Sequence, residues 1–113
     1  MNSKRDLKKQ IRLICGDLVG ECLLMGEVCP EEKQGEVGQL VIDLAVLQES
    51  TIEKISFNFD KSVRDFATRH DYLKARSAYN RSAYATLREQ FNTRLNEIVH
   101  RMNEVAGLAK GDE

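Results

Sequence analysis

Apolar residues return at every third or fourth position along most of the chain, which is the spacing of a helix with one buried face. Between residues 11 and 29 they form the stripe Ile11, Cys15, Leu18, Cys22, Met25 and Cys29. This pattern predicts a helix over residues 4–28, with Ser3 as its N-cap and Pro30 as its stop. The glycines and charges of the segment PEEKQGEVG predict an interhelix loop over residues 29–38.

A second apolar stripe runs from Val37 to Phe59 and predicts a helix that begins near Glu36. The alternating segment ISFNF is typical of a strand, so a β-hairpin over residues 40–59 is the alternative. The helical spacing accounts for more residues. Moreover, neither Gly nor Pro occurs between Gly38 and Gly107, whereas a β protein needs turn residues throughout.

A third stripe extends from Phe66 to Val105 after a turn at FNFDKS, where Ser62 and Asp65 resemble a capping box. Its middle is polar, at Ser77 and Asn80. Because few globular helices exceed about 25 residues, we predict a break within RSAYNRSAY, residues 76–84. The expected fold is therefore all-α, a single domain over residues 1–113 forming a mainly antiparallel bundle of four helices. The alternative is three helices with one long C-terminal helix. Residues 108–113 are expected to be a frayed tail.

The three cysteines at positions 15, 22 and 29 are each seven residues apart. On one straight helix, neighbouring thiols would lie about 10.5 Å apart along the axis. That separation prevents a disulfide and prevents a shared zinc ion. We therefore interpret the thiols as core residues, with a metal or redox role as the alternative. Three reduced thiols, without an evident export signal, predict a cytoplasmic protein.

Histidines provide little support for a chemical site. Glu97 and His100 form a Glu-x-x-His step, as in di-iron bundles, but Ala67 stands where the second step would need a carboxylate. His100 also points away from the apolar stripe of its own helix. His70 lies on the stripe and is expected to be a partly buried structural residue. We predict no catalytic, cofactor-binding or metal-binding residue, no cofactor, and no enzymatic activity.

Charge is distributed unevenly, although the net charge is −1. Residues 17–53 carry one basic and nine acidic groups, whereas residues 54–101 carry ten basic and five acidic groups. The simpler interpretation is that basic helices lie beside acidic ones, with arginines on both flanks of the third stripe. The alternative is a partner or nucleic-acid surface that mixes cations with aromatic rings: Arg76, Tyr79, Arg81, Tyr84 and Arg88. The nearly neutral chain favours the first interpretation. No apolar run approaches the length of about 20 residues that a membrane span needs.

The segments MNSKRDLKKQIRLICGDLVGECLLM and REQFNTRLNEIVHRMNEV together resemble small uncharacterised all-helical proteins of bacteria. The resemblance implies a small helical bundle and brings no catalytic or ligand motif. We expect a non-catalytic protein-interaction or regulatory module, whose partner is another protein or a second copy of the chain. The polar Ser77 and Asn80 motivate the homodimer, since a buried Asn often fixes helix register. The alternatives are a nucleic-acid accessory protein that uses the basic helices and a small metal or redox protein.

Overall fold

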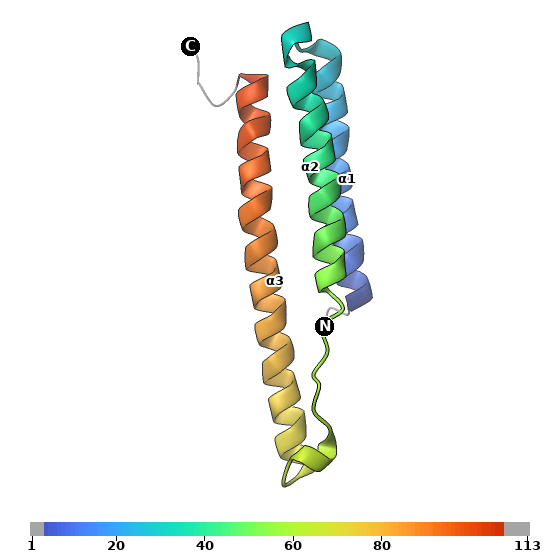
Figure 1. The fold of residues 1–113 in the computed structure, drawn as a ribbon, viewed down its shortest axis with the longest axis vertical. Coiled ribbons are helices and arrows are strands. Elements are labelled where there is room, and N and C mark those ends of the chain that lie inside the picture. Colours follow the sequence, from blue (N-terminus) through green and yellow to red (C-terminus); the bar gives the residue numbers. More distant parts are fainter. Residues whose placement is uncertain (1–3, 108–113) are drawn as a thin grey trace.

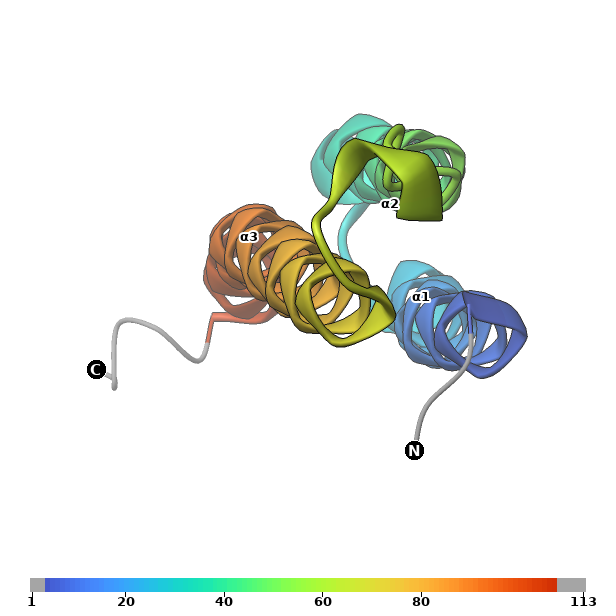
Figure 2. The ribbon, with the colours of Figure 1, turned by 90° about the horizontal axis from the view of Figure 1, so that it is seen from below.

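The computed structural model describes residues 4–107, which form three long helices and two short 3-10 turns. The helices are α1 (Lys4–Val28), α2 (Gln34–Lys54) and α3 (Arg69–Ala106). The short turns are η1 (Glu31–Lys33) and η2 (Val63–Asp65). Successive helices run in opposite directions, and seen end-on they occupy the corners of a triangle (Figures 1 and 2). The all-α prediction is confirmed, and the β-hairpin over residues 40–59 is wrong because α2 covers most of that range.

The prediction of four helices is wrong, and the alternative of three is right. The segment 76–84 is helical throughout and lies inside α3. It contains no Gly or Pro that would interrupt the helix, and its alanines favour helix formation. The polar middle of the stripe therefore marks a change in what covers α3, and the helix does not end there.

The ends of the helices follow recognisable local signals. Pro30 follows the end of α1 with extended backbone angles, as predicted. Gly107 closes α3 in the left-handed conformation, at φ 82°, which glycine adopts without steric cost. The Thr68 hydroxyl accepts a hydrogen bond of 3.0 Å from the Asp71 backbone N–H, so α3 begins later than predicted. The predicted box at Ser62 exists, with the Ser62 N–H donating to Asp65 at 2.8 Å, but it caps only η2.

The connection between α1 and α2 is shorter than the predicted loop over residues 29–38, because α2 begins at Gln34. The two helices approach closely there. A Cβ built on Gly26 would lie 3.3 Å from the Val37 side chain, so this glycine permits the tight hairpin. The predicted N-cap Ser3 and the predicted tail 108–113 lie outside the described residues.

The core is one apolar seam shared by all three helices, and it confirms the structural interpretation of the cysteines. Cys22 is fully buried, Cys15 is 1 % exposed, and Cys29, which directly follows α1, is half-buried. The buried apolar residues are Leu7, Ile11, Cys15, Cys22, Val37, Leu40, Leu44, Leu47, Ile55, Leu87, Phe91, Ile98, Met102 and Val105. The first buried residue of α3 is Leu87, so the N-terminal half of α3 lies outside this core.

The molecule is consequently elongated. Its extents are 65 × 23 × 20 Å, and its radius of gyration is 19.3 Å, against about 13 Å for a compact domain of this length. α3 has 38 residues and α1 has 25, so α3 is longer by about 20 Å at 1.5 Å per residue. Figure 1 shows α3 projecting below the other two helices, with the segment between α2 and α3 running down beside it.

Candidate functional site

A groove runs along the seam between α2 and α3, on the side away from α1. Its lower part is a hollow of about 300 Å³ with largely apolar walls. A neighbouring hollow of about 440 Å³ shares Lys54, Thr86 and Gln90 with the first and continues to Arg94. We call these two hollows together the α2/α3 groove. They are lined by Lys54, Phe57, Tyr79, Ser82, Ala83, Thr86, Leu87, Glu89, Gln90, Thr93 and Arg94.

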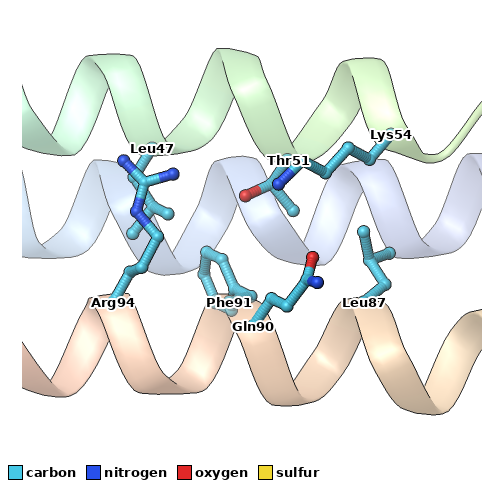
Figure 3. Close-up of a pocket in the computed structure, with 7 residues that line it drawn as sticks. All are labelled: Leu47, Thr51, Lys54, Leu87, Gln90, Phe91 and Arg94. Atoms are coloured by element: carbon cyan, nitrogen blue, oxygen red, sulfur yellow. The ribbon is translucent and has the colours of Figure 1, made fainter.

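The floor of the α2/α3 groove is closed by the core. Between Leu47, Leu87 and Phe91 the free space is only about 10 Å³, which is room for about one water molecule. Figure 3 shows Gln90 and Arg94 rising from α3 toward α2, while Lys54 extends from α2, with α1 behind the gap. The groove is thus an open trough that is apolar beside Phe57 and Tyr79 and cationic beside Lys54 and Arg94.

The lower wall of the groove belongs to a cluster of aromatic rings that fastens the overhanging half of α3. Phe57 makes edge contacts with Tyr79 and Tyr84, at centroid distances of 6.3 and 5.0 Å. Phe59 lies 5.5 Å from the ring of Tyr79 and also contacts Phe66 and Tyr72. The segment that leads from α2 to α3 therefore supplies the rings that cover the N-terminal half of α3.

Lys4 fixes this segment to the start of α1. Its ammonium group donates a hydrogen bond to the carbonyl oxygen of Phe57 and lies 4.7 Å from the centroid of the same ring. At the opposite end of the molecule, Lys33 donates to the carbonyl oxygen of Val105 at 3.4 Å. The open end of the α1/α2 hairpin is thus bonded to the segment that follows α2. The closed end of the hairpin is bonded to the C-terminal end of α3.

The five residues predicted as a mixed cationic and aromatic surface lie in different surroundings. Tyr79 and Tyr84 are half-buried and contact Phe57, so their rings are occupied by intramolecular packing. The guanidinium of Arg76 lies 5.8 Å from the ring of Tyr72. Arg81 and Arg88 are exposed. Of the five, only Tyr79 lines the α2/α3 groove.

Phe57 and Phe59 were not predicted as site residues, although the sequence carries a signal for the aromatic cluster. All three tyrosines and three of the four phenylalanines fall between residues 57 and 84. Such a concentration predicts mutual packing of the rings once the chain reverses direction between two helices.

Charge matching between α2 and α3 occurs where the arginine flank meets Asp43. Arg101 contacts the Asp43 carboxylate at 2.5 Å, and Gln39 donates to the same carboxylate at 2.9 Å. The hydrogen bond from Arg101 contributes most to a lowered pKa of Asp43, and Gln39 and the charge of Arg94 act in the same direction. The interpretation that basic helices lie beside acidic ones is thus confirmed at this position.

Thiols and histidines form no arrangement suited to metal chemistry in the described part of the chain. Burial raises the pKa of the Cys15 thiol, and burial together with the Glu21 charge raises that of Cys22. His100 lies 3.3 Å from Glu104, and both side chains are exposed. His70 is exposed too, which corrects its predicted partial burial. Within residues 4–107, no group of three or more His, Cys, Asp or Glu side chains could hold a metal ion.

None of the helices in the described part of the chain is long and apolar enough to cross a bilayer. Comparison of the chain with protein-family models, with curated proteins and with solved structures found no match.

Proposed function

We propose that this protein is a non-catalytic interaction module that accepts one helix of a partner protein in the α2/α3 groove. The observation that carries the proposal is the groove itself, open along its length and backed by a closed apolar floor. In a four-helix bundle, a fourth helix covers the trough that a three-helix arrangement leaves open. The partner helix would take that position. The protein would act in the cytoplasm, where its thiols stay reduced.

The dimensions of the groove suit a short amphipathic helix. The wall formed by α3 runs from Tyr79 to Arg94, and the 15 helical steps between these residues correspond to about 22 Å or four helical turns. A helix that docks in such a groove uses apolar anchors at positions i, i+3 or i+4, and i+7. These anchors would contact Phe57, Ala83 and Leu87.

The charged residues that line the groove favour partner helices with polar residues of the opposite charge. Lys54 and Arg94 both line the upper hollow, against the single acid Glu89. Acidic residues beside the apolar anchors would therefore be favoured through electrostatic complementarity. The predicted ligand is an amphipathic helix with an acidic flank.

Site-specific photo-crosslinking in the producing cell tests this proposal. A photoreactive phenylalanine in place of Thr86, in the groove wall, should give a protein adduct of defined mass. The same label in place of Asn96, an exposed position of α3 outside the groove, is the matched control and should give none. Ala83→Arg would place a long charged side chain in the lower hollow and should abolish the adduct. Equal labelling at both positions, or adduct formation that survives Ala83→Arg, would refute the groove as the binding site.

A second candidate function, nucleic-acid binding, is favoured by the division of charge along the molecule. The lower half in Figure 1, residues 4–16 and 47–93, carries thirteen basic and seven acidic groups. We call it the basic half. Electrostatic binding to phosphates would weaken steeply with salt. Retention on single-stranded DNA at about 50 mM salt that disappears at about 300 mM would support this function. No retention at the lower salt concentration removes it.

A further inference from the structure

The face of α1 that points away from the core is unusually apolar for a surface. Leu13, Leu23 and Leu24 are 63 %, 59 % and 66 % exposed. We call this surface the outward face of α1. It consists of Lys9, Leu13, Gly16, Gly20, Leu23, Leu24 and Glu27, which share one side of the helix at about 100° per residue and are all exposed.

Two glycines lie at the centre of this face, and the fold of the single chain makes no use of them. A Cβ built on Gly16 or Gly20 would meet nothing within 4 Å. Each glycine weakens α1 by about 1 kcal/mol relative to alanine. Glycines with leucines on either side allow another helix to approach the α1 backbone closely.

The sequence of the outward face is complementary to itself when reversed. About a point level with residue 18, an antiparallel copy sets Gly16 opposite Gly20 and Leu13 opposite Leu23. The same register sets Lys9 opposite Glu27, so opposite charges meet at both ends of the apolar centre. A two-fold interface requires this reciprocity, because each contact must occur twice.

The molecule as a whole is basic toward the Lys9 end of α1 and acidic toward the Glu27 end. The end opposite the basic half, residues 17–46 and 94–107, carries three basic and nine acidic groups, and we call it the acidic half. An antiparallel pair centred on residue 18 would set residues 4–16 of each chain, with five basic groups and one acidic group, beside the acidic half of the other chain. A parallel pair would set like charges together, which disfavours it.

We propose that the outward face of α1 binds the same face of a second copy of this chain, in an antiparallel two-fold dimer with Lys9 opposite Glu27. This face lies on the opposite side of the molecule from the α2/α3 groove (Figure 2), so the proposal does not depend on the proposed function. It also moves the dimer contact away from Ser77 and Asn80, because Ser77 is exposed and both residues lie on α3. A single pair of helices gives an interface at or below about 1,200 Å², so we expect a dissociation constant in the micromolar range.

A charge-swap experiment tests both the occupant and the register. Sedimentation equilibrium of the full chain, from about 1 to 200 µM, should show a monomer–dimer equilibrium that weakens with salt. Lys9→Glu and Glu27→Lys should each weaken the dimer about tenfold or more, because each places like charges together at two symmetric positions. The two changes combined restore opposite charges and should return the constant to within about threefold of wild type.

Two controls separate this interface from general effects of charge and hydrophobicity. Glu21→Lys makes the same charge change as Glu27→Lys on the same helix but off the outward face, and should change the constant less than about twofold. Leu13→Lys should abolish the dimer, whereas Ile42→Lys, at a residue of α2 that is 56 % exposed, should not. A wild-type monomer at the highest concentration, a higher oligomer, or a double variant that stays as weak as the single ones would overturn the proposal. None of these results would alter crosslinking at Thr86, so the two proposals can fail separately.

Discussion

The overhanging half of α3 should lose its protection against amide hydrogen exchange when Phe59 is truncated, while the three-helix core stays folded. Residues 69–86 of α3 include no fully buried side chain, and the core begins at Leu87. An isolated helix of about 15 residues is only marginally stable in water. The overhang must therefore derive its stability from the aromatic cluster, in which Phe59 contacts three other rings.

The size of the effect follows from those three contacts. The rings of Phe66, Tyr72 and Tyr79 lie 6.1, 5.9 and 5.5 Å from that of Phe59. Each aromatic pair contributes about 0.5–1.5 kcal/mol, so Phe59→Ala should cost about 2–4 kcal/mol locally. Because every 1.4 kcal/mol is a factor of ten, amide exchange over residues 69–80 should accelerate between about 30-fold and 700-fold.

Hydrogen exchange followed by mass spectrometry measures this region separately from the rest. Peptides from residues 91–105 of α3 and from α1 should keep their wild-type rates. Val63→Ala is the matched control, because Val63 is 43 % exposed and has no ring to lose. If Phe59→Ala leaves residues 69–80 protected, the cluster does not hold the overhang. If it accelerates exchange in the whole molecule equally, the overhang and the core are one cooperative unit and the reasoning is wrong.

Three further predictions concern the core, the thiols and the ion pair between Arg101 of α3 and Asp43 of α2. Leu44→Ala removes a fully buried side chain and should lower the free energy of unfolding in urea by about 3–4 kcal/mol; a loss below 1 kcal/mol would contradict the packing. Of the three thiols, Cys29 should react readily with an aromatic disulfide reagent, whereas buried Cys15 and Cys22 should react only as fast as the protein unfolds. Asp43→Asn should lower stability by less than about 1 kcal/mol near pH 7. Since the native pKa of Asp43 is lowered, that difference should persist above about pH 4 and vanish as pH falls further; a difference that grows in acid would refute the assigned contact.

The helical pattern of the sequence predicted where α1 ends and that Cys15 and Cys22 are buried, because both depend on local rules. Pro30 cannot continue a helix. Cys15 and Cys22 fall on the inner side of α1 because a spacing of seven residues returns to the same face. Each of these conclusions requires only the geometry of one helix.

The number of helices could not be predicted in the same way, because it depends on what covers an apolar stripe. Ser77 and Asn80 interrupt the stripe where α3 leaves the three-helix core. At that level, aromatic rings from the segment after α2 replace the other helices as partners of α3. Periodicity records that a face is buried, and it carries no information on which distant segment buries it.

The candidate site could be predicted only in part, again because it depends on contacts between segments that are distant in the sequence. Tyr79 was selected for its chemistry and does line the groove, but its ring serves the aromatic cluster as well. Phe57 and Ala83 were not selected, since a phenylalanine and an alanine in helical sequence have the appearance of ordinary core residues. They become groove walls only when α2 and α3 lie side by side with no helix covering that seam.

The two proposed surfaces together imply a bivalent adaptor. The outward face of α1 and the α2/α3 groove lie on opposite sides of the triangle of helices, so one does not obstruct the other (Figure 2). A two-fold dimer through α1 would carry two grooves, one on each far side and running in opposite directions. Two partner helices joined by a linker that spans the dimer would then bind with an affinity above that of either helix alone. That gain depends on the dimer, so Leu13→Lys should remove it while leaving the affinity of a single partner helix unchanged.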